Sequence, residues 1–438
     1  MPEVGSRREP GRGAAPERMR VFSALSLWLR NASQLEGPFH FLRERGRWFW
    51  LLVAAGVAAR GFLVLFTAGT YDVGIWELHA RDVLAHGLVD AYRAGLGLNH
   101  PPLACWSVAG LLALSQGSGI PFAVLLRAPI AAVDLGSVFL LARLLRDSRY
   151  RWLAAGLYAI HPVAILLSAY HGNTDSSIAF FLLLAAICAV RGQAVRTGIA
   201  LGASLWIKVP GLLALPALLL SFPRWRDRLA CGVAAVVTGA TTYAPMIVLD
   251  PRLLYKRVFG YRGLFLHTTA WEPIWGPLGL LAPLLDLSGP ARALVLATAR
   301  GWYEHDTLVV LVPILALAWF RRDERTATGV GKTLAACYAV TYGFSTRWAF
   351  QYLAWSVPFW LPAGPVFFTG ATLLAGAYLY GLYAWLCGDL LLRGPWDFIG
   401  HPYWPRSLIW VRNAAVLFFM ASTCIDLVRA VRARCSRP

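Results

Sequence analysis

A short polar segment follows the first long apolar run of the chain. Residues 71–77 read YDVGIWE, and the preceding residues 48–68 are apolar apart from Arg60. An aspartate at the boundary between membrane and water can stay ionised while it is partly desolvated. A general base needs this combination, because it must be free of its proton and close to the reacting group. Asp72 is therefore the candidate catalytic residue.

Other polar side chains in separate segments are candidates for binding substrate. They are Trp76, Glu77, His100, His171, Asn173, Asp175, Lys208, Arg262, His267, Arg347, Gln351 and Tyr352. Lys208 is one of three lysines and lies in an apolar setting, where an ammonium needs an anion. Arg347 and Gln351 are one helical turn apart, and the guanidinium fork suits phosphate oxygens. These residue types, together with Asp72, predict a site that takes a proton from one substrate and holds an anionic group of another.

Simpler interpretations compete with each of these. Asp72 is also a favoured residue for capping the helix that follows, and Lys208 can extend its ammonium to the interface without a ligand. Glu77 fits a solvated helix face. Arg127 and Asp134 are two helical turns apart, so they share a face and can pair with each other or with neighbours inside a bundle.

The elements that must position these residues are membrane helices. The chain has 438 residues, of which 58% are hydrophobic and 15% charged, more apolar surface than one soluble core buries. The apolar runs are long enough to cross a bilayer as helices. A helix pairs its own backbone N–H and C=O groups, which other open structures would leave unpaired in hydrocarbon. Five of the clearest runs are 48–68, 121–145, 229–249, 307–320 and 408–428. The sequence predicts an all-α polytopic membrane protein with about twelve to fourteen transmembrane helices.

Charge and cysteine usage exclude other classes. The net charge of +18 comes from arginines at the ends of apolar runs and in short loops, which is typical of membrane topology signals and not of a nucleic-acid-binding domain. The seven cysteines have no paired CxxC spacing and lie mostly within apolar runs, which argues against zinc and against a disulfide framework.

Orientation follows from the basic loops. The positive-inside rule places six of them in the cytoplasm, namely 43–47, 143–151, 191–196, 224–228, 321–325 and 429–437. Both termini are then cytoplasmic, with residues 1–47 and 431–438 as tails, and the candidate site residues converge on the non-cytoplasmic face. We see no soluble domain and no internal repeat.

Several of these motifs resemble a known superfamily. They are Asp72 after the first span, a first outer loop ending in PPL at 101–103, Arg127 and Asp134 along the second span, and YHGNTD at 170–175. In this order they resemble the GT-C superfamily of glycosyltransferases that use polyprenyl-phosphate sugars. The mannosyltransferases of glycosyltransferase family 87 and the glucosyltransferases that use dolichyl-phosphate glucose are the most similar. The resemblance covers residues 48–358.

The resemblance implies a GT-C-like helical bundle with interfacial helices in the first outer loop. It implies a catalytic module at 48–275 and a variable module at 276–430 that forms the groove for the lipid donor. The expected activity is inverting transfer of a hexose, with mannose favoured, from a polyprenyl-phosphate donor to the hydroxyl of a lipid-linked or glycan acceptor. Asp72 matches the catalytic aspartate of the family, and Trp76 beside it can stack on a sugar.

The resemblance also bears on cofactors, location and alternatives. Gly74 stands where the Asp-x-Asp version of the loop has its second acid, so no metal or other cofactor is expected. The expected location is the bacterial plasma membrane, or the endoplasmic reticulum of a eukaryote, with membrane lipids as surroundings and no nucleic-acid partner. A transporter or lipid flippase, and a non-catalytic scaffold with the same fold, are the alternatives.

Overall fold

The computed structural model describes residues 47–94, 97–260, 276–281, 284, 288–347, 349–397, 400–401 and 404–436. The chain divides between Gly46 and Arg47 into two units, and the description below concerns the second. The regular elements of the described residues are helices, with no strand among them. The predicted all-α class is confirmed. Two predicted site residues, Arg262 and His267, lie outside the described residues.

The described helices follow one another along the chain in this order. They are α2 (Arg47–Phe66), α3 (Tyr71–His86), α4 (Leu88–Ala94), α5 (Pro102–Ser118), α6 (Phe122–Leu144), α7 (Arg151–Ala159), α8 (Pro162–Ile165), η2 (Leu166–Tyr170), α9 (Ser176–Val190), α10 (Ala194–Ser204), η3 (Val209–Ala214), α11 (Leu215–Leu220), α12 (Trp225–Leu249), α13 (Pro251–Leu254), η4 (Tyr255–Phe259), α14 (Pro277–Leu281), α15 (Gly289–Glu304), α16 (Asp306–Phe320), α17 (Ala327–Phe344), η6 (Phe350–Trp355), α18 (Val357–Ala363), α19 (Pro365–Cys387) and α20 (Arg406–Cys435).

Five of these helices are long and apolar enough to cross a membrane. They are α2, α6, α12, α19 and α20, and the described residues contain seven candidate spans if two bent helix pairs each count as one. Large apolar side chains such as Val236 and Val248 of α12 are 69% and 82% exposed, as expected of surfaces that face lipid. Length, composition and this exposure support an integral membrane protein.

The number of candidate spans is about half of the twelve to fourteen predicted. The apolar run at 152–170 is long enough for one span but bends by 46° between Ala159 and Pro162, since a proline cannot continue the hydrogen-bond ladder of the preceding turn. A second pair, α15 with α16, bends by 59°. The apolar run at 176–190 is the short helix α9, and the apolar run at 355–365 holds only α18 before α19 begins. Apolar runs show where chain is buried or faces lipid, but they do not show where a helix breaks.

Close helix packing depends on small residues at two points of α10. A Cβ on Gly198 would lie 2.2 Å from the carbonyl oxygen of Cys231, and one on Gly202 would lie 2.6 Å from that of Ala235. The two glycines are four residues apart and therefore share the face that packs against α12. Their missing side chains let the two helices approach closely, as in many membrane helix pairs.

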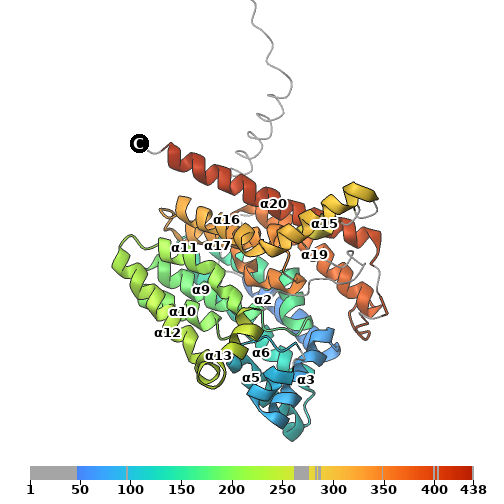
Figure 1. Cartoon of the computed structure of the whole chain (residues 1–438). Helices are drawn as coiled ribbons and strands as arrows, with labels where there is room; N and C mark the ends of the chain where they lie inside the picture. Colours follow the sequence, from blue (N-terminus) through green and yellow to red (C-terminus); the bar gives the residue numbers. More distant parts are fainter. Residues whose placement is uncertain are drawn as a thin grey trace, which may run out of the picture. The chain divides into compact units, whose positions relative to one another are not determined.

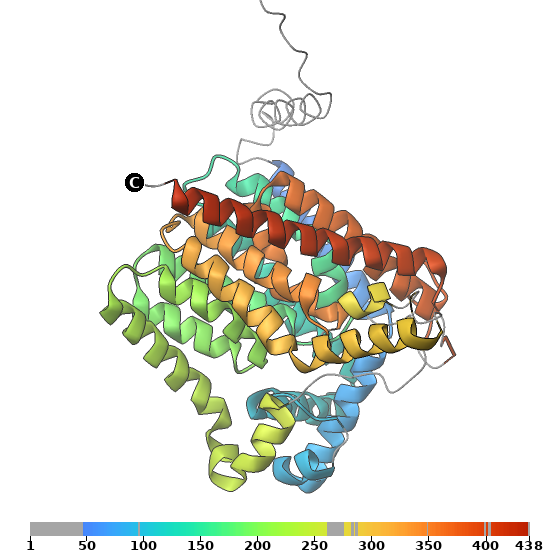
Figure 2. The same cartoon turned by 45° about the horizontal axis from the view of Figure 1, so that its top comes forward.

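The C-terminal helices pack together around α17. Helix α17 contacts α16, α18 and α20, and α20 contacts α19 as well. Figure 1 shows α20 in red lying along α16 and α17, and Figure 2 shows the same from a second side. Most side chains of α17 are buried, so this helix belongs to the interior of the bundle.

The first loop of the chain is itself helical. Helix α3 packs on α4 and α5, and α5 packs on α6 and α12. These helices lie near α13 at the end of the molecule opposite α20 (Figures 1 and 2). The expected helices of the first loop are therefore present, while α5 was not anticipated. Their placement in the membrane interface stays a prediction.

Candidate active site

Asp72 lies at the start of α3 and is held by a segment about a hundred residues away. Its Oδ2 accepts a hydrogen bond from Nδ2 of Asn173 at 2.8 Å and lies 3.1 Å from Nε2 of His171. The helix is capped by Thr70, whose hydroxyl accepts from the backbone N–H of Asp72 and donates to the carbonyl of His171 at 2.7 Å. The interpretation of Asp72 as the cap is therefore wrong, because Thr70 caps the helix and leaves the carboxylate free for other contacts.

Arg127 joins the two segments that carry Asp72 and His171. Its guanidinium donates to the carbonyls of Leu63 at 3.1 Å and Thr67 at 2.6 Å, near the end of α2. It also donates to the carbonyl of Ala169 at 3.3 Å, two residues before His171. One buried side chain thus satisfies backbone acceptors that the end of a helix leaves open, and it fixes α2 against η2.

Two glycines make the close approach of these segments possible. Gly69 and Gly172 have φ angles of +83° and +76°, a region that residues with a Cβ rarely adopt. A Cβ on Gly172 would lie 2.4 Å from Cγ2 of Val73, and one on Gly69 would lie 2.8 Å from the same atom. Both backbone shape and space therefore require glycine at these positions.

His171 connects Asp72 to the C-terminal part of the chain. Its Nδ1 lies 2.9 Å from the hydroxyl of Tyr383 on α19, and the two rings stack with an interplanar angle of 11°. The imidazole therefore donates from Nε2 to the ionised Asp72, while Nδ1 is bonded to the hydroxyl of Tyr383, so both ring nitrogens have a partner. Tyr383 was not predicted, because it lies within an apolar helix and 212 residues from its partner.

These contacts keep Asp72 ionised. Burial by itself raises the pKa of the carboxylate, but His171, Asn173 and the charge of Lys208 outweigh burial and lower the pKa to about 2. The side chain is 28% exposed, and among the described residues no hydrogen bond reaches Oδ1. Asp72 thus has one oxygen held by the protein and one open to an incoming hydroxyl.

A second charged cluster forms around Asp175. Lys208 lies between α10 and η3, and its Nζ is 3.2 Å from Oδ2 of Asp175, while Nε1 of Trp355 donates to Oδ1 at 2.6 Å. The same Nζ lies 4.8 Å from the centre of the Tyr352 ring. The anion that Lys208 needs is therefore present within the chain. A further role of Lys208 or Asp175 toward a ligand stays a prediction.

Trp76 is buried beside His100 and does not present its ring to solvent. The indole is only 2% exposed, and its centre lies 4.3 Å from that of the imidazole. In this conformation the indole is covered by protein, and its stacking on a sugar stays a prediction. His100 lies within electrostatic range of Asp72 and Lys208, since both charges affect its pKa.

The other predicted residues are distributed around this centre. Glu77 pairs with Arg81 one turn along α3, which agrees with a solvated helix face. Arg347 donates to the carbonyl of Tyr303 at 2.9 Å and lies 3.8 Å from Asp306, so these contacts hold it at the junction of α15 and α16 and not at Asp72. Gln351 lies in η6 with Tyr352 and Trp355, and its buried Oε1 has no hydrogen-bond partner among the described residues.

Arg127 and Asp134 do not pair with each other. Asp134 instead accepts from Nε and Nη2 of Arg60 at 3.0 and 2.6 Å, and from the hydroxyl of Ser168 at 3.0 Å. Tyr158 also donates to this carboxylate. Of the two expectations, pairing with neighbours in the bundle is confirmed and pairing within the helix is wrong, because both side chains reach from α6 to groups on α2 and η2.

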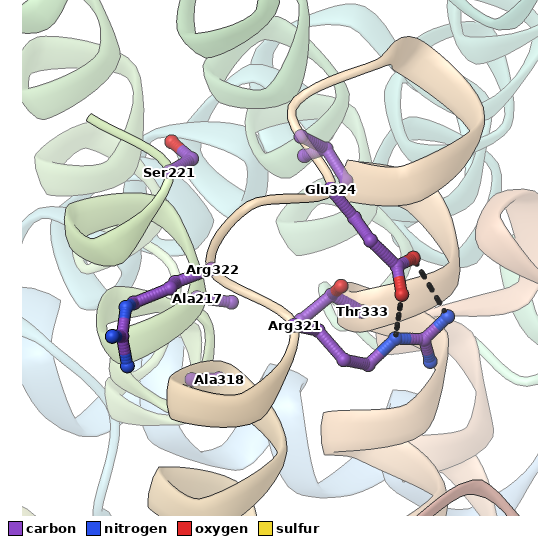
Figure 3. Close-up of a pocket in the computed structure, with 8 residues that line it drawn as sticks. Ala217, Ser221, Ala318, Arg321, Arg322, Glu324 and Thr333 are labelled. Atoms are coloured by element: carbon purple, nitrogen blue, oxygen red, sulfur yellow. Dashed lines mark hydrogen bonds and ion pairs between the residues drawn. The ribbon is translucent and has the colours of Figure 1, made fainter. Parts of the chain in front are cut away.

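A pocket at another place in the described structure contains none of the predicted site residues. It lies where α11, α16 and α17 meet and is lined by Ala217, Ser221, Ala318, Arg321, Arg322, Glu324, Val330 and Thr333 (Figure 3). Arg321 is bound there by both carboxylate oxygens of Glu324 at 3.3 and 3.1 Å, and its other nitrogen is 3.7 Å from Asp426. The cation is compensated, so the pocket offers a ligand no free charge from this side chain.

No group of three His, Cys, Asp or Glu side chains suited to hold a metal ion is found in the described part of the chain. Comparison of the sequence with models of known protein families gave no match, and comparison with curated proteins gave none either.

Proposed function

We propose that this protein is an inverting glycosyltransferase that moves a hexose from a polyprenyl-phosphate donor to an acceptor hydroxyl. The observation that supports it most is the carboxylate of Asp72, which is ionised, held at one oxygen by His171 and Asn173, and open at the other. A purely structural acid would be expected to have both oxygens bonded, as the acid in the buried pair of Asp134 with Arg60 does.

In the proposed reaction Oδ1 of Asp72 takes the proton of the acceptor hydroxyl. The acceptor oxygen forms a bond to the anomeric carbon from the face opposite the phosphate, and the bond from that carbon to the phosphate oxygen breaks. The electron pair leaves with the lipid phosphate. A carboxylate with a pKa of about 2 is a weak base, so proton transfer must accompany bond formation, when the acceptor oxygen becomes acidic.

The departing phosphate needs positive charge, and Lys208 is the cation near Asp72. Its charge lowers the pKa of Asp72, so the two groups are within electrostatic range of each other. Its partner Asp175 offsets part of this charge, so the proposal requires Lys208 to turn from Asp175 toward the phosphate as the bond breaks. The proposal also includes a GT-C-like architecture, a preference for mannose and a site on the non-cytoplasmic face.

A transporter is the second candidate, and one observation favours it. The broken helix of α7 with α8, together with the buried pair of Arg60 and Asp134, has the form that transporters use for binding sites within the membrane. The Asp134 carboxylate, however, is already bound by Arg60, Tyr158 and Ser168. A substrate would have to displace protein contacts there, whereas Asp72 offers an oxygen that needs none displaced.

The deciding experiment is sugar transfer by the purified protein in nanodiscs with a radiolabelled polyprenyl-phosphate sugar. Wild type is expected to transfer label and Asp72→Asn to lose at least about a hundredfold in rate, in line with the loss of a general base. Asp82→Asn is the matched control, because Asp82 lies on the same helix and, among the described residues, pairs with His86 alone. Equal rates for wild type and Asp72→Asn would contradict the proposal, and a folded Asp72→Asn protein that keeps its cellular role would favour a transporter or scaffold.

A further inference from the structure

Several buried polar atoms near Asp72 have no hydrogen-bond partner in the described structure. They are Nδ1 and Nε2 of His100, Oδ1 of Asn173 and Oγ1 of Thr174. Folded proteins pair nearly all such atoms, because a buried donor or acceptor without a partner costs about 1–3 kcal/mol. Four such atoms around one catalytic candidate indicate a binding site in which a ligand supplies the missing hydrogen bonds.

His100 is held in place by its backbone and its ring face, so its nitrogens are free for a ligand. Its carbonyl accepts from the hydroxyl of Tyr92 and from Sγ of Cys105 at 3.5 Å. Its ring packs on the buried indole of Trp76, with 4.3 Å between the centres. These contacts hold the carbonyl and the ring of His100, and its two ring nitrogens have no hydrogen-bond partner among the described residues.

The chemistry of these atoms suits a neutral partner. Burial lowers the pKa of His100 well below its usual value, and the charges of Lys208 and His79 lower it further, while Asp72 opposes them. A neutral imidazole has one N–H donor and one acceptor nitrogen, and the amide oxygen of Asn173 accepts only. A hydroxyl group can accept from the N–H of His100 and donate to the amide oxygen of Asn173, and the second ring nitrogen can accept from a neighbouring hydroxyl of the same sugar. An anion could use the N–H alone and would face the two acceptors.

We propose that His100 and Asn173 bind a sugar hydroxyl of the acceptor and so determine which acceptor reaches Asp72. This inference rests on the proposed glycosyl transfer and adds the class of acceptor, which is a neutral sugar. Asn173 also donates to Asp72, so the same amide fixes the base and meets the substrate. His100 acts on specificity, since it contacts the acceptor beside the hydroxyl that reacts.

The test measures binding of octyl glycosides of mannose, glucose and galactose to the full chain in nanodiscs by saturation-transfer NMR titration. One glycoside is expected to bind wild type, and one of its monodeoxy analogues is expected to bind about tenfold more weakly. His100→Phe keeps a ring on Trp76 and removes both nitrogens. It is expected to bind the parent glycoside about tenfold more weakly and to lose sensitivity to that deoxygenation, as in a double-mutant cycle.

His401→Phe is the matched control, because His401 also packs its imidazole on an indole, that of Trp385 at 5.0 Å. It is expected to bind like wild type. If His100→Phe does not elute as a folded monodisperse protein, His100→Gln takes its place, since glutamine keeps a donor and an acceptor in shifted positions. It is then expected to change which deoxy analogue is tolerated.

Four results would overturn the proposal. The first is that wild type binds no glycoside, which would assign the free atoms to water. The second and third are equal binding of all monodeoxy analogues by wild type, and unchanged glycoside binding by the His100 variant. The fourth is that the His100 variant weakens binding of titrated polyprenyl-phosphate mannose instead of the glycosides, which would assign the hydroxyl to the donor. Failure of glycosyl transfer itself is seen separately, with labelled donor and wild-type protein, so the two failures are distinguishable.

Discussion

Nε2 of His171 lies 3.1 Å from Oδ2 of Asp72, although the two residues are 99 positions apart in the chain. The contact joins the start of α3 to the turn before α9, and through Tyr383 it extends to α19. The ionisation and the position of the candidate base therefore depend on residues from three parts of the chain. Four predictions test this dependence.

Replacing His171 by Phe should raise the pKa of Asp72. Burial raises this pKa and His171 is the largest opposing influence, so its loss leaves burial less opposed. In wild type the folded pKa of about 2 lies below the unfolded value of 3.8, so the folded carboxylate stays ionised until the pH falls through about 2. The acidic limb of kcat/KM for transfer should move to higher pH in the variant.

His86→Phe, which removes the imidazole paired with Asp82, is the control and should leave the acidic limb at its wild-type pH. An unchanged acidic limb in His171→Phe would contradict the prediction.

Replacing Tyr383 by Phe should slow catalysis without weakening acceptor binding. The tyrosine hydroxyl orients the imidazole that holds Asp72, so we expect kcat to fall about tenfold, equivalent to about 1.4 kcal/mol, with KM little changed. Tyr380→Phe is the control on the same helix, because its hydroxyl donates to the carbonyl of Leu390 and not to the site around Asp72. A matching fall in kcat for Tyr380→Phe would show a general effect on α19.

Lys208 and Asp175 should depend on each other for stability. Replacing either one, by Met or Asn respectively, leaves a buried charge unpaired and should cost about 3–5 kcal/mol, while the double variant should recover much of it. Thermal unfolding in detergent measures this, with Lys256→Met as an exposed control. If Lys208 also binds the donor phosphate, the double variant should stay inactive although it is stable. Full activity in the double variant would assign Lys208 a structural role alone.

Replacing Arg127 by Lys should reduce both stability and transfer. A lysine has three donors on one atom and cannot reach the carbonyls of Leu63, Thr67 and Ala169 together. We expect a loss of about 2–5 kcal/mol in unfolding free energy, since buried acceptors lose their partners, and a fall in kcat because Asp72 and His171 are less well aligned. Arg143→Lys, at the exposed end of the same helix, should behave like wild type in both measurements.

Local sequence was enough to find Asp72 and the segment that contacts it. The aspartate follows an apolar run, and the polar turn at 170–175 stands out between two others. Both signals depend only on neighbours in the chain. The pairing of Asp134 with Arg60 could not be chosen over pairing with Arg127, since all three lie on apolar helices whose rotation and depth the sequence leaves open.

The sequence by itself determined that the chain is helical and apolar on the scale of a membrane, because hydrophobic length and backbone hydrogen bonding allow few other structures. It also indicated which acids and bases are candidates. Only the tertiary structure decided that Trp76 is buried, that Lys208 already has Asp175, and that Tyr383 supports His171. These contacts join helices that are distant in the sequence. They arise from helix packing and from the positions of helix breaks, which no local sequence pattern predicts.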